Sequence, residues 1–351
     1  MMHRRLALIA AVAVAMAAPV LLPVSVSGQT STPATSSNSP PPRANTPKPA
    51  PRATSTSRVP RAADGRPDLE GVWSWATITP LERPSTLAGK TELTDEEAAV
   101  LEQTAAEGRV DRAPRPGDTG TYNQFWFDRG TRVIEGKRSS LIVDPADGRI
   151  PPMTPEMQKR EEERAKILAG EPRTWLDRSL SERCIVRPWS GPPITPGNYN
   201  NNLQIFQTRD YVVLHVEQSH DSRIVPLDGR PHPDKSIRQI LGDARGHWEG
   251  DTLVVDSTNF TDQLGKTAIR GVGGNLHLVE RFTRVDADTL NYEFTVDDPT
   301  AYTKPWTALM PMSKTTDKIY EYACFEGDHT VENVLRGTRV QEKLREEAGR
   351  K

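Results

Sequence analysis

Residues 276–296 read LHLVERFTRVDADTLNYEFTV, two runs of alternating side chains joined by the acidic turn Asp286–Asp288. In the second run every other residue from Leu290 to Val296 is apolar. This is the period of a strand that lays one face on a core. The stretch therefore predicts a β-hairpin with one buried face.

The same pattern continues over Leu203–Phe325, where short apolar runs alternate with turns of aspartate and glycine. We therefore expect a mainly β fold with helical additions (α+β), with roughly nine or ten strands in an antiparallel β-barrel, closed or nearly closed. An open, strongly twisted sheet packed by the helices is the alternative. The other apolar runs are Ile205-Phe206, Tyr211–Val216 and Leu253–Asp256, and Asp228-Gly229 and Gly250-Asp251 are turns between runs.

The first half of the chain adds helices to this sheet. Thr94 followed by Glu97 is a capping box, which predicts a helix to about Glu107. Thr154 followed by proline predicts the start of a second helix. A third helical pattern, charged enough to lie on the surface, covers 330–347. Further strands are expected at 71–73, 125–127, 131–135 and 140–143.

Two segments precede the part that is expected to fold. Residues 1–28 combine a basic start, an apolar run and small residues near Gly28, which indicates a cleaved signal peptide rather than a spanning anchor. Residues 29–63 are rich in Pro, Ser and Thr and predict a disordered linker. We expect export to the periplasm or the extracellular space. Residues 64–180 should hold strands and two helices, and 181–351 a β-meander with a C-terminal helix, both in one folded unit.

Charge and cysteine content narrow the class of protein. Lys and Arg total 45 against 47 for Asp and Glu, a net charge of −2, which argues against a dedicated nucleic-acid binder with a basic face. No second hydrophobic run is long enough to span a bilayer, so we expect no membrane span in the mature protein. Cys184 and Cys324 are the two cysteines, and in an oxidising compartment such a pair predicts a disulfide.

Candidate chemistry gathers directly after the apolar run Tyr211–Val216. The chain has no phosphate loop and no His-Glu-x-x-His, Gly-x-Ser-x-Gly or Cys-x-x-Cys motif. The run is followed by Glu217-Gln218-Ser219-His220-Asp221-Ser222-Arg223, at a strand end, where sheet proteins often place functional groups. A histidine beside a carboxylate suits a general base or a metal ligand. A hairpin end with solvated charges and one structural ion pair is the alternative.

We expect a site centred on His220, with a neighbouring carboxylate orienting its ring and Arg223 supplying positive charge for an anionic substrate group. His220 and His232 are the candidate ligands if a divalent metal is bound, and no organic cofactor motif is evident. The catalytic candidates are His220, Glu217, Asp221, Arg223, His232 and Glu249.

Two further features have both a structural and a functional interpretation. Glu280 lies on an apolar strand face, where an unpaired carboxylate is costly to bury. We therefore expect a structural ion pair between Glu280 and an arginine of a neighbouring strand, with Arg223 and Arg245 as candidates. Large aromatic residues near turns could form a ligand-binding wall or belong to the core. These candidates are Trp248, Tyr302 and Trp306.

Several motifs are specific enough for a comparison with known families. They are Tyr122–Gly130, Ser140–Pro152, Tyr199–Asn202, Leu227–His232, Gly246–Val254, Glu280–Val285 and Tyr322–Gly327. In these motifs the chain resembles a large family of exported, uncharacterised bacterial proteins, over most of 64–343. The resemblance implies export and a shared fold but no activity. Relatives read His-Glu-Gly-Asn where this chain has Phe325-Glu326-Gly327-Asp328. A smaller likeness, Gly71-Val72-Trp73 on a first strand, is similar to the entrance of lipocalin-type barrels.

Three functions are compatible with these features. The first is an exported enzyme that acts on a small organic molecule by acid–base chemistry, of hydrolase, lyase or isomerase type. The second is a non-catalytic β-barrel protein that binds a small ligand, and the third is a tethered surface interaction module. Convergence of the acid–base candidates in one concave site would favour the enzyme. A cavity ringed by aromatic residues would favour the binding protein.

Overall fold

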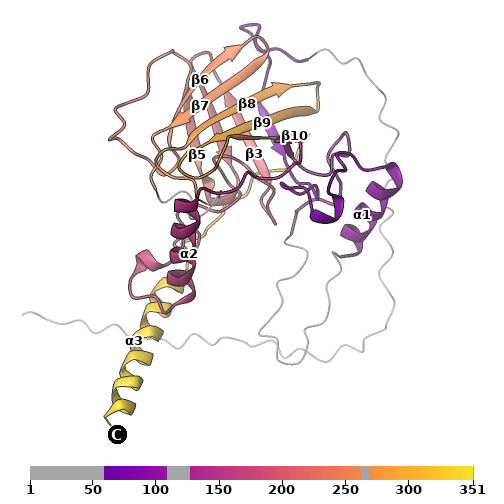
Figure 1. The fold of residues 1–351 in the computed structure, drawn as a ribbon. Helices are drawn as coiled ribbons and strands as arrows, with labels where there is room; N and C mark the ends of the chain where they lie inside the picture. The colour runs from indigo at the N-terminus through magenta and orange to yellow at the C-terminus, as the bar shows by residue number, and fades with distance from the viewer. Residues whose placement is uncertain (1–58, 109–126, 263–268, 270, 351) are drawn as a thin grey trace, which may run out of the picture. The chain divides into compact units, whose positions relative to one another are not determined.

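A ten-stranded antiparallel sheet with three α-helices makes up the described part of the computed structural model, residues 59–108, 127–262, 269 and 271–350 (Figure 1). These residues belong to one compact unit. The expected signal peptide and the expected linker up to residue 58 lie outside them. Among the described helices, none combines the length and the apolar character needed to cross a membrane.

The strands form one sheet in the order β5-β4-β3-β1-β10-β9-β8-β7-β6. The tenth strand, β2, pairs with Thr307 and Ala308 near the start of β10. Every pairing is antiparallel, as the alternating pattern predicted. The strands are β1 (Gly71–Ser74), β2 (Ile142–Asp144), β3 (Asn202–Gln207), β4 (Tyr211–Val216), β5 (Ser222–Pro226), β6 (Asp243–Glu249), β7 (Thr252–Thr258), β8 (His277–Arg284), β9 (Thr289–Asp297) and β10 (Trp306–Thr315).

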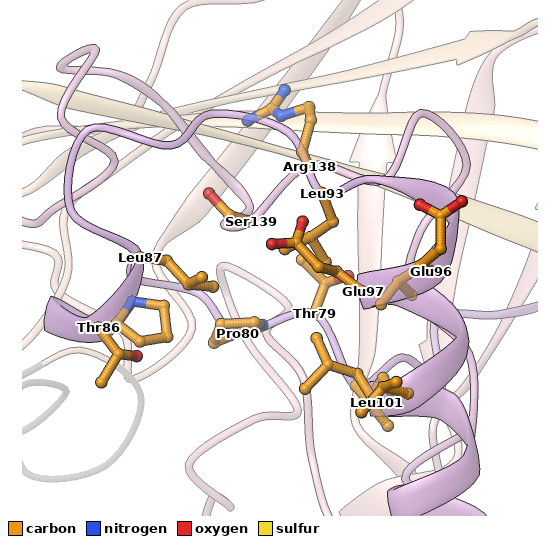
Figure 2. A pocket seen from close by; sticks show the side chains of 14 residues that line it. Thr79, Pro80, Thr86, Leu87, Leu93, Glu96, Glu97, Leu101, Arg138 and Ser139 are labelled. Carbon is orange, nitrogen blue, oxygen red and sulfur yellow. The ribbon is translucent and has the colours of Figure 1, made fainter.

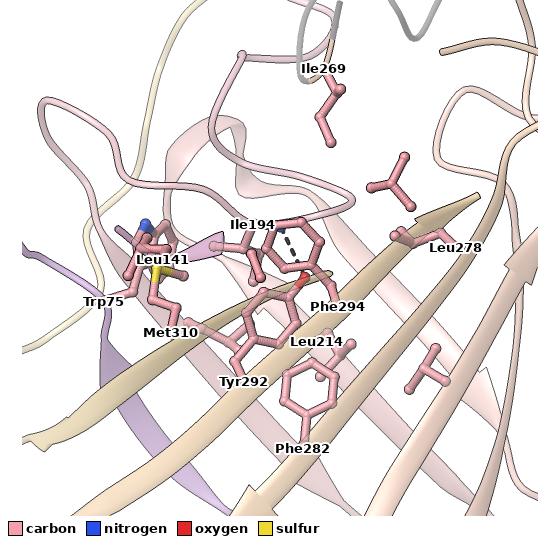
Figure 3. Close-up of a cluster of buried hydrophobic side chains, with 14 of the residues drawn as sticks. Trp75, Leu141, Ile194, Leu214, Ile269, Leu278, Phe282, Tyr292, Phe294 and Met310 are labelled. Atoms are coloured by element: carbon pink, nitrogen blue, oxygen red, sulfur yellow. Dashed lines mark hydrogen bonds between the residues drawn. The ribbon is translucent and has the colours of Figure 1, made fainter. Parts of the chain in front are cut away.

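The predicted hairpin at 276–296 is confirmed as β8 and β9, with Glu280 opposite Phe294 and Phe282 opposite Tyr292. Its buried face supplies the centre of the core, where the rings of Phe282 and Tyr292 lie 5.0 Å apart and those of Tyr292 and Phe294 5.5 Å apart (Figure 3). Each fully buried side chain of this size contributes about 1.5 to 3 kcal/mol relative to exposure. The alternation of the hairpin therefore fixes both its register and its inner face.

The two edge strands of the sheet approach each other without forming a ladder. A Cβ atom on Gly246 of β6 would lie 2.6 Å from Leu227 Cδ2 and 2.7 Å from Val225 Cγ1, so only glycine allows the close contact with β5 and its exit. Yet no strand pairing joins β5 to β6 in the described residues. The sheet is not closed, and neither a closed barrel nor the lipocalin-like plan is confirmed. The coarser prediction of a mainly β, α+β fold is confirmed.

The helices are α1 (Asp95–Glu107), α2 (Pro155–Ala169) and α3 (Thr330–Gly349), with short 3-10 turns η1 (Ser85–Leu87), η3 (Trp175–Asp177) and η4 (Gln218–His220). The capping box of α1 is present, with the Thr94 side chain accepting from the Glu97 N–H and the Glu97 carboxylate accepting from the Thr94 N–H. The helix after Thr154 begins with proline, as predicted.

One predicted strand in the first half is wrong. Residues 131–135 form no strand, because their backbone bonds to the loop at 77–79 instead. Ile78 N–H donates to Arg132 O at 3.0 Å, and Ile134 N–H donates to the Thr79 hydroxyl at 3.0 Å. Of the strand expected at 125–127, only Phe127 is described, and it is not in a strand. The strand expected at 140–143 is observed as β2 at 142–144.

Candidate functional site

A polar cleft of about 710 Å³ opens beside the end of β4. Asp128, Arg187 and Glu217 line it, together with residues from the 199–202 loop and from the segment between β10 and α3. These parts are distant in sequence, and most lie outside regular strands or helices. The cleft is therefore assembled by tertiary structure around one strand end.

Glu217 is a buried carboxylate in the wall of this cleft, with 3% of the residue exposed. Leu203 pairs with Val216, so Asn202 faces the next residue of the neighbouring strand, and the Glu217 N–H donates to Asn202 O at 2.9 Å. The Asn202 amide donates to Glu217 Oε2 at 2.8 Å, and the Tyr320 N–H donates to Oε1 at 3.3 Å. The strand pairing thus holds the carboxylate in a fixed position.

Asp128 is another of the carboxyl groups that line the cleft, and the sequence did not suggest it as a candidate. The Asn201 side-chain amide donates to Asp128 Oδ1 at 3.0 Å. Burial raises the pKa of Asp128, the nearby Glu217 carboxylate raises it further, and the hydrogen bonds from Asn201 act in the opposite direction. The only sequence signal was its place in the motif Tyr122–Gly130, one of the motifs on which the family resemblance was based.

Aromatic side chains form another part of the wall. The rings of Tyr199 and Tyr322 are stacked 6.4 Å apart, and Trp189 meets Tyr199 edge-on at 5.8 Å. The Arg187 guanidinium lies 5.4 Å from the centre of the Tyr322 ring. The neighbouring Asn200 has a φ of 56°, a left-handed conformation that asparagine tolerates better than most residues. Aromatic rings and polar groups therefore line one space.

The 317–328 segment closes one side of the cleft although it contains no helix or strand. The Tyr322 N–H donates to His220 Nε2, and the Tyr320 N–H donates to Glu217. The predicted disulfide is confirmed, with the Cys184 and Cys324 sulfurs 2.07 Å apart. This covalent link and two hydrogen bonds to the 217–220 turn hold the segment against the sheet.

The turn from Glu217 to Asp221 carries consecutive residues in the left-handed region, Ser219 at φ 68° and His220 at φ 53°. Such a conformation costs a residue other than glycine about 1 to 3 kcal/mol and is enriched at functional sites. Among the described residues, the fully buried Gln218 amide finds no hydrogen-bond partner, and neither does Asp221 Oδ2. Burial raises the pKa of Asp221 to about 6, although Arg223 opposes the shift.

Arg223 does not reach the cleft but forms the ion pair predicted for Glu280. Its Nη1 and Nη2 donate to Glu280 Oε2 at 2.5 Å and Oε1 at 2.8 Å. The Tyr292 hydroxyl donates to Glu280 Oε1 at 2.6 Å and accepts the Ile194 N–H at 3.0 Å, the dashed line in Figure 3. Burial, then the Glu280 carboxylate, raises the pKa of Tyr292 far above its usual value.

Two expectations are therefore corrected: that the partner of Glu280 comes from a neighbouring strand, and that Arg223 binds a substrate anion. The ion pair is confirmed, but β5 is not a neighbour of β8 in the sheet, so Arg223 reaches Glu280 across the core. Both nitrogens that were expected to meet a substrate anion are occupied by a protein carboxylate instead. The arginine is 7% exposed and its role is structural.

His232 belongs to a different cluster on the other half of the sheet. Its Nδ1 lies 2.6 Å from Asp243 Oδ2, and its Nε2 lies 3.0 Å from Asp256 Oδ1. Among the described residues, one set of three potential metal ligands is close enough to share an ion, Cys184, Cys324 and Asp328, and both of its sulfurs are in the disulfide. The structure does not bring His220 and His232 together as a metal pair.

The remaining sequence candidates also lie away from the cleft. Glu249 is exposed and pairs with Arg281 and with His247 Nε2, the latter at 3.1 Å. Trp248 is partly buried, and the Arg66 guanidinium lies over it, 5.7 Å from the centre of the Trp248 ring. Tyr302 and Trp306 are core residues, 3% and 0% exposed, whose rings meet edge-on. Of the nine candidates, Glu217 lines the cleft and His220 holds its wall.

No protein-family model, no curated protein and no solved structure matches this chain. Its class is defined in structural terms. It is an α+β protein with an open antiparallel sheet and a disulfide-bounded polar cleft at one strand end.

Proposed function

We propose that this protein is an exported enzyme that binds a small polar organic molecule in the polar cleft and transforms it by acid–base chemistry, with hydrolysis as the simplest case. A pair of carboxyl groups, Asp128 and Glu217, supports the proposal, because burial and their mutual repulsion push the pKa of Asp128 up. Neighbouring carboxyl groups in different environments are a common source of separate acid and base roles.

The two groups have surroundings that suit different tasks. Asp128, with its raised pKa, is the group that would donate a proton to a leaving group. Glu217 accepts N–H hydrogen bonds on both oxygens and is held in one position, which suits a base that must be aligned with a bound molecule. Tyr199 and Tyr322 would pack against the flat part of the substrate.

Export is part of the proposal. The basic and apolar start of the chain supports it, and so does the disulfide, because such bonds persist in oxidising compartments such as the periplasm. The resemblance of its motifs to a large family of exported bacterial proteins also supports this location.

A substrate screen with matched variants tests the enzyme proposal. Wild-type protein would be offered a panel of p-nitrophenyl esters and glycosides, and kcat/KM would be measured for any substrate that is turned over. We expect Glu217→Gln and Asp128→Asn each to lower kcat/KM about 100-fold to 10,000-fold, the usual range for a lost general acid or base. The control is Glu249→Gln, an exposed carboxylate outside the cleft, and it should leave kcat/KM unchanged. Equal losses in all three variants would reject the assignment.

A non-catalytic binding protein is the second candidate, and one observation favours it. Both Glu217 oxygens already accept hydrogen bonds from the protein, so the carboxylate could shape a binding surface without moving a proton. In that case polar ligands would raise the melting temperature of wild-type protein but would not be turned over. Glu217→Gln would then change the affinity and nothing else.

A further inference from the structure

An apolar pocket of about 550 Å³ lies beneath α1 and shares no lining residue with the polar cleft. Figure 2 shows it between α1, which presents Leu101, and the segment 80–87, which carries Pro80 and Leu87. Ile78, Leu93 and Val133 complete its apolar wall. The volume lies within the range of about 300 to 1,000 Å³ that small-molecule sites occupy.

The way α1 is attached explains why the space beneath it stays open. Its first turn is fixed by polar contacts, the capping box and the ion pair between Lys90 and Glu97. Beyond that turn, Ala98 is the one buried residue of the helix. Val100 and Leu101 remain 63% and 42% exposed although they line the pocket. A ligand that covers this pair would gain affinity, because it removes their remaining apolar surface from water.

Most polar groups around the pocket are already engaged within the protein. The Thr79 hydroxyl accepts the Ile134 N–H, and the Ser139 hydroxyl accepts from Arg83 and donates to Lys90 O. The Glu97 carboxylate binds Lys90 and the Thr94 N–H.

Arg138 is engaged in the same way, because its Nη2 donates to the carbonyl oxygens of Ser140, Leu141 and Ile142. Because these four side chains already bind protein groups, a ligand with a strongly polar head would regain few of the hydrogen bonds it makes with water. Together with the apolar wall of Ile78, Leu93, Val100, Leu101 and Val133, this favours an apolar ligand.

We propose that the pocket beneath α1 binds a neutral, apolar small molecule of aromatic or short aliphatic character, at a site independent of the polar cleft. The neutral fluorophore N-phenyl-1-naphthylamine has this chemistry and becomes bright when it leaves water. Titration of the purified protein should show saturable binding of one probe per chain.

Two variants and two controls test this assignment. Leu101→Asp places a charge on the pocket wall and should weaken probe binding at least tenfold. Leu87→Trp fills the same space without a charge and should weaken probe binding as much. Unfolding caused by an introduced charge therefore cannot explain the loss of binding in both variants. Leu344→Asp on α3, a helical leucine that is 53% exposed, and Glu217→Gln in the cleft should leave the affinity unchanged.

Three outcomes would overturn the proposal. The first is the absence of saturable binding by wild-type protein, as expected if another part of the chain or a second copy fills the pocket. The second is unchanged affinity in Leu101→Asp and Leu87→Trp. The third is an equal loss in Leu344→Asp, which would indicate nonspecific adsorption of the probe.

Discussion

Two buried glutamates of this sheet have opposite surroundings. Glu280 is 0% exposed and meets an arginine and a tyrosine inside the core, and Glu217 is 3% exposed but meets amide groups in the wall of an open cleft. Burial alone therefore does not identify a functional carboxylate. The partners and the access to solvent separate the two, because both oxygens of Glu280 are occupied inside the core, whereas Glu217 lines a cleft.

The turn and strand that follow β4 connect these two environments. Glu217 begins the turn at the cleft, and Arg223 lies just beyond it on β5 with its side chain in the core. The left-handed residues Ser219 and His220 make this change of direction possible. A compact run of charged residues can therefore serve two unrelated purposes.

The largest expected effect comes from removing the buried ion pair between Glu280 and Arg223. Glu280→Ala should lower the free energy of unfolding by about 3 to 5 kcal/mol, because Arg223 is left buried without a counter-charge. Urea unfolding followed by circular dichroism measures the loss. Glu293→Ala on the outer face of the same hairpin is the control and should stay within about 0.5 kcal/mol of wild type.

A double variant sharpens the result. Replacing Arg223 and Glu280 together with methionine removes both charges and should recover much of the loss. A Glu280→Ala variant as stable as wild type would contradict the role assigned to the pair.

The next effect concerns the wall of the cleft. Cys184→Ala combined with Cys324→Ala should lower the free energy of unfolding by about 2 to 4 kcal/mol, because the long loop between the cysteines is no longer closed. The same change should release the 317–328 segment and reduce activity or ligand binding in the polar cleft. Probe binding beneath α1 is the internal control and should persist. Full cleft function without the disulfide would show that hydrogen bonds alone hold the segment.

The smallest effect is a pH dependence that originates in the turn between the two regions. Because the folded pKa of Asp221 is raised from 3.8 to about 6, the native state favours the protonated form. Its contribution to stability is complete below about pH 4 and is lost as the pH rises through about 6. Asp221→Asn should remove this slope and stabilise the protein at pH 7 by about 1 to 2 kcal/mol, after allowance for partial solvent screening. Melting temperatures would be measured between about pH 4 and 7. The same dependence on pH in wild type and Asp221→Asn would refute the raised pKa of Asp221.

Local sequence patterns determined much of the fold. Alternation at 276–296 determined the β8–β9 hairpin and its buried face, and Thr94 with Glu97 determined the start of α1. The need to neutralise a carboxylate on an apolar strand face predicted the ion pair of Glu280, and the pair of cysteines, together with the expectation of export, predicted the disulfide. These inferences succeeded because each depends on spacing within one segment or on a single chemical requirement.

Only the tertiary structure decided which distant segments meet. The sequence placed Glu217, His220, Arg223 and His232 in one site, yet the structure divides them among the cleft, the core and a separate cluster on β6 and β7. Asp128 lies near Glu217 because irregular loops bring the two segments together. Such loops have no periodic pattern, so the sequence could not reveal this proximity. Strand alternation specifies the face on which a side chain lies, but strand order and loop paths specify what lies opposite. The sequence by itself therefore determined the elements and the kinds of partner they need, and the fold determined the partners.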